Sequence, residues 1–211
     1  MQQLTYRSIE ERDYKEIEAL LEQTGYFETF TPNEKVRKLV LEIYLRSCLE
    51  EQTYTKVVET QGKVIGILCG RSDADYKRSV WTPYTCGLLG RLLKLHLTKE
   101  GSATIKAYRD FSKIYKELIQ GREEDFDGEL TLLLVDENYR GTGIGKQLTQ
   151  RFLNHMKKAG GQSIYVYTDT GCNYGFYDRL GFVKAAKREE KIEVEKGNRD
   201  MSVYLYYKKF K

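Results

Sequence analysis

Apolar and polar positions repeat along the chain with two periods, and changes between them mark the expected elements. Short alternating or continuous apolar runs bounded by turn residues are typical of β-strands, whereas apolar positions three and four residues apart are typical of helices. In chain order, this pattern predicts strands at 4–8, 53–60, 63–70, 130–135, 164–168, 182–194 and 201–210. It predicts helices after Asp13, after Thr31, from Ile144 to Gly160, and over 173–180.

Capping signals precede the first two helices. Asp13 and Glu16 have the spacing of a capping box, and the helix that follows is expected to end at Gly25. Thr31 and Pro32 begin the second helix in the preferred order of cap and first-turn proline. Its apolar stripe is predicted to comprise Val36, Leu39, Val40, Ile43 and Cys48.

Residues 71–127 have a helical pattern that interrupts the succession of strands. Leu88, Leu92 and later Ile114 recur at helical spacing, which predicts a helical insertion between the third and fourth strands. Arg91 and Lys94 give its first segment a basic face. That face suits a membrane-surface helix, but an amphipathic helix packed on the domain is the commoner structure, and we expect no membrane contact.

The stretch VDENYRGTGIGKQL, residues 135–148, connects a strand to a helix inside a strand–helix–strand unit with parallel strands. Amides at a helix start lack intrahelical partners, and the helix dipole favours anions there. Glycines allow a ligand to approach these amides, and flanking Arg140 and Lys146 can add charge-assisted bonds. The turn is therefore predicted to bind a phosphate or pyrophosphate; an ordinary tight turn is the alternative.

Other phosphate-loop patterns do not fit this turn. A Walker loop would need glycine at Arg140 and Ser or Thr at Gln147, and a dinucleotide fingerprint would need glycine at Lys146. The pattern that fits is RxxGxG, formed by Arg140, Gly143 and Gly145. Together with GFYDRLGF at 175–182, it closely resembles the GNAT superfamily of acyl-CoA-dependent N-acyltransferases.

The resemblance implies an α/β (α+β) fold with a mixed central sheet, helices on both faces and a splayed parallel strand pair. We expect one domain over 1–211, with acetyl-CoA as co-substrate and pantetheine lying between the splayed strands. The amide of Leu133 would bind the acyl carbonyl, and Val135 the pantetheine arm. The implied cofactor contacts are Leu133, Leu134, Val135, Arg140, Gly141, Thr142, Gly143, Ile144, Gly145, Lys146 and Asn173. Asn173 lies slightly later than the asparagine of many family members.

The resemblance also implies catalytic residues. A protonated amine must lose a proton before attack, and the leaving thiolate benefits from an acid. Tyr177, the tyrosine of the FY pair, is the candidate acid, with aromatic packing as the alternative; Glu129, near the start of the central strand, is the candidate base. Cys172 lies nearby, but neither His96 nor His155 has an evident partnership with it, so the sequence does not support a covalent route.

The predicted function is transfer of an acetyl group to a primary amine by direct attack in a ternary complex. A catalytically silent acyl-CoA-binding module is the alternative. The segment GYFETF at 25–30 places Tyr26, Phe27 and Phe30 around Glu28. These residues would suit a cationic amine, or would clamp two helices as a hydrophobic staple.

Composition and charge limit the classes of function that the chain suits. The chain has 211 residues, 40% of them hydrophobic, and a net charge of +4 from 35 basic and 31 acidic residues. The hydrophobic fraction suits a single hydrophobic core, and the basic residues form no evident stripe of the kind that binds nucleic acid. The four cysteines form no CxxC pair, so we expect neither a metal site nor disulfides. Without a signal-like or membrane-spanning run, a cytoplasmic location is expected. A homodimer is common among relatives.

Overall fold

The computed structural model describes residues 3–77, 83–194 and 197–210. Its sheet has seven strands in the order β1-β2-β3-β4-β5-β7-β6. The strands are β1 (Thr5–Arg7), β2 (Tyr54–Thr60), β3 (Lys63–Ser72), β4 (Gly128–Val135), β5 (Ser163–Asp169), β6 (Val183–Val194) and β7 (Gly197–Lys209). The helices are α1 (Tyr14–Glu22), α2 (Tyr26–Phe30), α3 (Glu34–Glu50), α4 (Pro83–His96), α5 (Lys99–Ile119), α6 (Ile144–Lys158) and α7 (Gly175–Arg179).

The parallel pair in the middle of the sheet is splayed, as predicted. β4 and β5 are parallel, and their described register is the single pair Glu129 with Tyr165. On its other side, β4 pairs with β3 from Gly128 to Val135, with an irregularity that leaves Thr131 as an extra residue. A bulge bends a strand and increases its local twist. β4 therefore stays joined to β3 while it diverges from β5.

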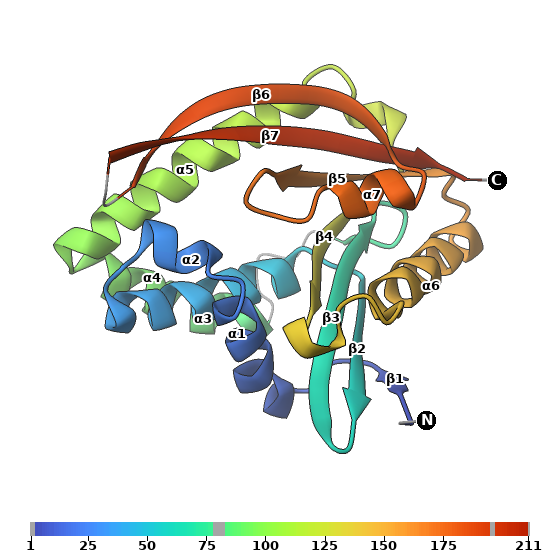
Figure 1. The fold of residues 1–211 in the computed structure, drawn as a ribbon, viewed down its shortest axis with the longest axis horizontal. Coiled ribbons are helices and arrows are strands. Elements are labelled where there is room, and N and C mark those ends of the chain that lie inside the picture. Colours follow the sequence, from blue (N-terminus) through green and yellow to red (C-terminus); the bar gives the residue numbers. More distant parts are fainter. Residues whose placement is uncertain (1–2, 78–82, 195–196, 211) are drawn as a thin grey trace.

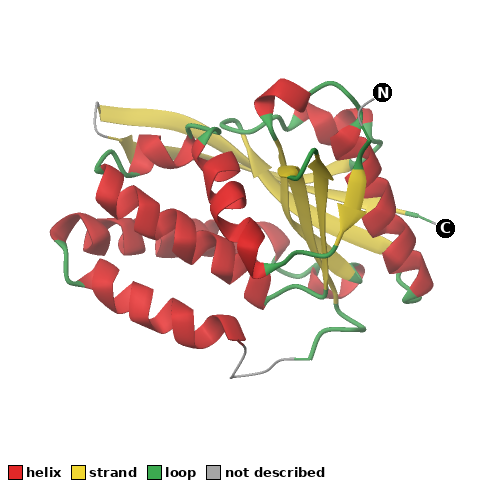
Figure 2. Cartoon of the chain, turned by 90° about the horizontal axis from the view of Figure 1, so that it is seen from below, coloured by secondary structure: helices red, strands yellow, loops and turns green. Residues whose placement is uncertain are grey.

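Helices cover both faces of the sheet (Figures 1 and 2). Helices α6 and α7 pack on one face, where Ile144, Leu148, Phe152 and Met156 of α6 enter the core. The other face is covered by α1 and α3 over β2–β4 and by α5 over β5–β7. The long α6 lies at right in Figure 1, and the helices of the other face lie at left. This layered arrangement confirms the predicted fold class.

The helical insertion between β3 and β4 is confirmed. It consists of α4 and α5, and Figure 1 shows the longer α5 running beneath the β6–β7 ribbon. Arg91 on α4 pairs with Glu42 on α3, so part of the basic face is used inside the molecule. Lys94 is exposed. No described helix is long and apolar enough to cross a bilayer.

The helix caps differ from the prediction. Asp13 makes no side-chain cap bond to α1; its carboxylate accepts from Arg7 at 2.7 Å and from the Glu10 amide at 2.8 Å. The carboxylate of Glu16 accepts instead from the Val64 amide at 2.6 Å, joining α1 to the β2–β3 hairpin. Asp13 thus belongs to a capping box with Glu10 at the short turn Glu11–Asp13 before α1, and Glu16 is used in a long-range contact.

The cap of α3 lies two positions later than predicted. Asn33 caps the helix, accepting from the amides of Lys35 and Val36, and Thr31 is buried before it. The predicted apolar stripe of α3 was also partly wrong, because the side chains of Leu39, Val40 and Ile43 are only partly buried. Packing of α4 on α3 turns a different side of α3 inward. Its buried residues are Val36, Leu41, Leu45, Cys48 and Leu49.

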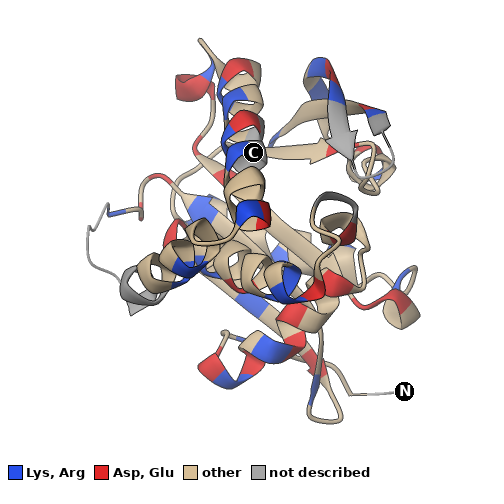
Figure 3. Ribbon diagram, turned by 90° about the vertical axis from the view of Figure 1, so that its left-hand side faces the viewer, with Lys and Arg blue, Asp and Glu red and all other residues tan. Residues whose placement is uncertain are grey.

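Charged residues of both signs are mixed over the ribbon in Figure 3, as the small net charge implies. The most deeply buried ion pair joins Arg7 to Asp13, with side-chain exposures of 20% and 4%. Arg7 also contacts Glu59 on β2 at 2.6 Å. The Arg7 guanidinium thereby ties β1, α1 and β2 together at the N-terminal end of the described chain.

Candidate active site

The turn between β4 and α6 presents a row of unpartnered amides. Gly141 and Gly143 have φ of 78° and 87°, in the left-handed region that favours glycine. Gln147 donates the first helical bond of α6, to the Gly143 carbonyl. Within the described residues, the backbone amides of 141–146 have no hydrogen-bond partner. Such a row at the positive end of a helix dipole is suited to an anion.

Local hydrogen bonds hold this turn in place. The buried Asp136 caps the short turn Glu137–Tyr139 by accepting from the Asn138 amide at 2.9 Å. Burial would raise the pKa of Asp136, but the bonds from Asn138 and the nearby Lys63 hold it below its usual range. Arg140 donates from Nε to the Val135 carbonyl at 3.2 Å. Its guanidinium is therefore held beside the exit of β4.

Successive backbone amides of β4 point to opposite sides of the strand. Asp136 donates to the Ile65 carbonyl at 2.8 Å, and Leu134 is paired with Ile67. In an antiparallel ladder, hydrogen-bonded and non-hydrogen-bonded pairs alternate. Leu133 and Val135 occupy the alternate positions, so their amides point away from β3 toward the diverging β5. The amide of Leu134 is used in the ladder, which leaves only its side chain for cofactor contact.

The start of α6 packs closely against α7. A Cβ on Gly145 would meet the ring of Phe176 at 3.3 Å, so this glycine permits close contact between the two helices. Tyr177, the next residue, is 9% exposed and lies among aromatic rings that include Phe182 and Tyr206. Burial raises the pKa of Tyr177, with a further contribution from Cys172. The Tyr177 ring is therefore part of the aromatic core, and its hydroxyl stays protonated at neutral pH.

Glu129 lies on the opposite face, where β4 and β5 are still paired. Its carboxylate accepts from the Tyr165 hydroxyl at 2.9 Å and lies 3.6 Å from the Arg71 guanidinium. Burial raises the pKa of Glu129, while Arg71 and the Tyr165 hydrogen bond act in the opposite direction. The glutamate side chain is 15% exposed, so it is not merely a solvated residue at a strand start.

Cys172 and the histidines show no nucleophilic arrangement. Cys172 is an exposed residue, but partial desolvation of its thiol and then the Asp169 carboxylate raise its pKa, which disfavours the thiolate. His155 lies 3.4 Å from Asp75 and its ring packs on Tyr54, away from Cys172. Among the described residues there is no group of three potential His, Cys, Asp or Glu metal ligands.

The predicted aromatic box has a different arrangement. Tyr26 donates to Asp169 at 3.1 Å, and Phe27 packs edge-on against Tyr44 of α3 with ring centroids 5.0 Å apart. Glu28 is exposed, and the side chain of Phe30 lies outside the described residues. The carboxylate that the structure brings to these rings is therefore that of Asp169.

Asn173 lies in the exposed β5–α7 turn. Its backbone oxygen accepts from the Phe176 amide at 3.0 Å at the start of α7. No described side-chain bond holds its amide group, which leaves that group available to a ligand. The sequence-based reasoning missed Arg71 because the predicted strand ended at residue 70. It missed Asp169 because that position departs from the asparagine pattern of the family.

Comparison with known proteins shows the family. The acetyltransferase (GNAT) family profile matches residues 15–182, and the chain belongs to this family. A segment of 59 residues is 41% identical to N-alpha-acetyltransferase 30 of Schizosaccharomyces pombe, covering 27% of this chain and 39% of that relative. This chain thus spans well under half of that relative's length.

Solved structures show the same fold. An N-acetyltransferase from Staphylococcus aureus Mu50 aligns with a TM-score of 0.55 and 16% identity over 99% of both chains. A mutant agmatine N-acetyltransferase aligns with a TM-score of 0.60 and 14% identity over 98% of this chain and 99% of that chain. The ribosomal-protein-S18-alanine N-acetyltransferase of Escherichia coli aligns with a TM-score of 0.52 and 15% identity over 96% of this chain and 92% of that chain.

Proposed function

We propose that the protein transfers the acetyl group of acetyl-CoA to a primary amine by direct attack in a ternary complex. The observation that carries this proposal is the row of unpartnered amides at 141–146, continuous with the outward amides of Leu133 and Val135. The first set suits a pyrophosphate, and the second suits a pantetheine arm and an acyl carbonyl. Arg140 and Lys146 add positive charge beside the pyrophosphate, and Thr142 and Ile144 complete the set of residues around it.

Glu129 is the proposed base. A carboxylate whose pKa is raised takes a proton from an ammonium more readily than an ordinary glutamate does. Arg71 and Tyr165 hold its orientation from β3 and β5. The amine that has lost its proton to Glu129, directly or through water, then attacks the carbonyl carbon of the thioester.

Tyr177 is the proposed acid. As the new C–N bond forms, the C–S bond breaks and the sulfur leaves as a thiolate. A tyrosine with a raised pKa remains protonated at neutral pH and can donate its phenolic proton to that sulfur. The outward Leu133 amide stabilises the negative charge that develops on the carbonyl oxygen. Asn173, in the turn just before α7, adds a contact to the cofactor.

Release of free CoA thiol across an amine panel tests the proposal. The panel should contain small mono- and diamines and peptide N-termini, the latter because the fission yeast relative is named an N-alpha-acetyltransferase. We expect amine-dependent thiol release well above the hydrolysis of acetyl-CoA alone. Tight acetyl-CoA binding without amine-dependent release across the panel would instead indicate a silent acyl-CoA-binding module.

A further inference from the structure

Asp169 is a buried carboxylate without a cation. The described buried aspartates are Asp13, Asp136 and Asp169, which are 3%, 0% and 3% exposed. Asp13 is paired with Arg7 at 2.7 Å, and Asp136 has Lys63 at 3.5 Å. None of the ion pairs among the described residues includes Asp169. The Asp169 carboxylate accepts hydrogen bonds from Tyr26, Gly171 and Cys172, yet burial still raises its pKa, so a cation from outside the chain would stabilise its charged form.

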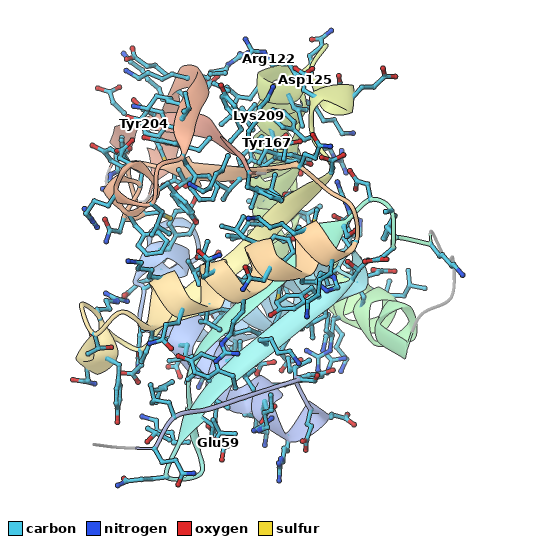
Figure 4. All side chains as sticks on the ribbon, turned by 90° about the vertical axis from the view of Figure 1, so that its right-hand side faces the viewer. Glu59, Arg122, Asp125, Tyr167, Tyr204 and Lys209 are labelled. Atoms are coloured by element: carbon cyan, nitrogen blue, oxygen red, sulfur yellow. The ribbon has the colours of Figure 1, made fainter. Side chains whose placement is uncertain are left out.

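One tyrosine contacts this carboxylate, and a stacked pair of tyrosines lies near that tyrosine. Tyr26 of α2 donates to Asp169, and its ring lies over Gly171, where an added Cβ would come within 3.2 Å of two ring carbons. Tyr167, labelled in Figure 4, lies two residues before Asp169 and on the same face of β5. Its hydroxyl donates to the Tyr115 backbone oxygen at 2.9 Å. The rings of Tyr115 and Tyr167 stack with centroids 4.4 Å apart. Tyrosine faces attract cations.

The electrostatics of this cluster also favour a positive ligand. Burial raises the pKa of Tyr26, and Asp169, Tyr115 and Cys172 raise it further. The pKa of Tyr44 is raised by Cys48 first, then by burial, Tyr115, Cys172 and Tyr26. Burial disfavours the charged form of Tyr26, and the Asp169 carboxylate adds a negative potential there that an ammonium group would offset.

The cation at Asp169 cannot be the reacting amine. A carboxylate stabilises the protonated form of an amine that it binds, and a protonated amine has no lone pair for attack. The proposed base Glu129 is paired with Tyr165, and Asp169 lies four residues further along β5 on the same face. At ~3.3 Å per residue, the two positions are about 13 Å apart along the strand. One acceptor can reach both.

We propose that the acceptor is a diamine or polyamine, one ammonium group of which is held by Asp169 and the tyrosines while a second amine reacts. This inference rests on the proposed acetyltransferase function and specifies its substrate class. The bond from Asp169 to the Gly171 amide uses Oδ1, and Tyr26 donates to Oδ2. An acceptor ammonium would add a charge-assisted hydrogen bond to this carboxylate.

The test compares 1,6-diaminohexane with hexylamine on the wild type and on Asp169→Asn. Asparagine retains an oxygen for the Gly171 amide but removes the charge. We expect the variant to raise KM for the diamine about tenfold or more, to leave its kcat nearly unchanged, and to lose the preference for the diamine. Glu28→Gln, which removes an exposed carboxylate of the same short helix as Tyr26, is the matched control and should keep both KM values.

Calorimetric binding of 1,6-diaminohexane supplies a readout that does not need turnover. The wild type should bind it about tenfold or more tightly than Asp169→Asn, with equal acetyl-CoA affinity and similar melting temperatures for the two proteins. Equal diamine affinity, or no diamine binding to the wild type, overturns the inference. Diamine binding that depends on Asp169 without any thiol release would contradict the acetyltransferase proposal and leave the cation site standing.

Discussion

In the proposed mechanism, Tyr177 must keep its proton until the thiolate leaves, and its buried position is consistent with that requirement. Replacing it with phenylalanine retains the ring that packs on Phe182 and Tyr206 but removes the hydroxyl. We expect Tyr177→Phe to lower kcat about 10²-fold with little change in acetyl-CoA affinity, measured by steady-state kinetics and calorimetry. Tyr204→Phe, in the same aromatic core, should retain the wild-type kcat. An unchanged kcat in Tyr177→Phe would remove this residue from the mechanism.

Arg71 lowers the pKa of Glu129, the proposed base. If Glu129 accepts the amine proton, it must be deprotonated, and activity should fall as the pH drops through the pKa of its carboxyl group. Arg71 lowers that pKa, and its removal must raise it. We therefore expect Arg71→Met to move the acidic limb of the kcat/KM profile to higher pH. Tyr165→Phe should move it in the same direction by removing a hydrogen bond to the carboxylate.

Two outcomes would contradict this role of Glu129. If Arg71→Met left the acidic limb in place, another group would have to be responsible for it. If Glu129→Gln retained the limb and the wild-type kcat, the base would lie elsewhere. Melting temperatures of the variants separate a shifted profile from lost folding, because Arg71 also bonds Asp73 and lies over the ring of Tyr76.

At the residue scale, the sequence offered candidate residues but not the groups that contact them. Glu129 and Tyr177 could be proposed from their motif positions, but the groups that tune them are remote in sequence. Arg71 becomes a neighbour of Glu129 only through the β3–β4 register. Asp169 meets Tyr26 across 143 positions of sequence. Such contacts arise from tertiary packing, and local patterns carry no information about them.

At the scale of elements, α6 offers a matched pair of glycines at its two ends. Gly143 and Gly160 have φ of 87° and 84°, and an added Cβ at either would meet nothing within 4 Å. Substitution with valine strains both backbones similarly, by at least ~1–2 kcal/mol. We expect both Gly143→Val and Gly160→Val to lower the melting temperature, but only Gly143→Val to weaken acetyl-CoA binding, by roughly tenfold or more.

This comparison separates ligand binding from backbone strain. Calorimetric titration should show wild-type affinity in Gly160→Val, because its strain lies at the opposite end of the helix. Equal loss of affinity in both variants would mean that α6 acts only through its stability. Retained affinity in Gly143→Val would place the pyrophosphate away from this turn.

Elements with strong internal periodicity were predicted well, and their ends were not. The buried positions of α6 and the type of connection between β2 and β3 follow from local sequence. The predicted cap of α1 was wrong because the Asp13 carboxylate bonds Arg7 and the Glu10 amide at the turn before the helix. The predicted cap of α3 was wrong because Asn33, two residues after Thr31, accepts from the first amides of the helix. Local propensity is a weak guide when a side chain has a better partner elsewhere.

At the scale of the whole molecule, the glycine turn and the order of strands and helices were sufficient to predict the layered sheet. The proposed acceptor face was not predictable in the same way, because α2, α3, α5 and β5 contribute to it from distant parts of the chain. The insertion shapes this face through Tyr115 of α5, which stacks on Tyr167. A chain with the same motifs and another insertion would present a different acceptor face.

A crystal structure of the acetyl-CoA complex tests the central claim most directly. We expect the pyrophosphate oxygens to lie about 2.7–3.2 Å from amide nitrogens of residues 141–146, and the pantetheine arm to lie between β4 and β5. The Tyr177 hydroxyl should face the sulfur. A coenzyme bound at another surface, or a crystal soaked in saturating acetyl-CoA with the turn still empty, would contradict the account.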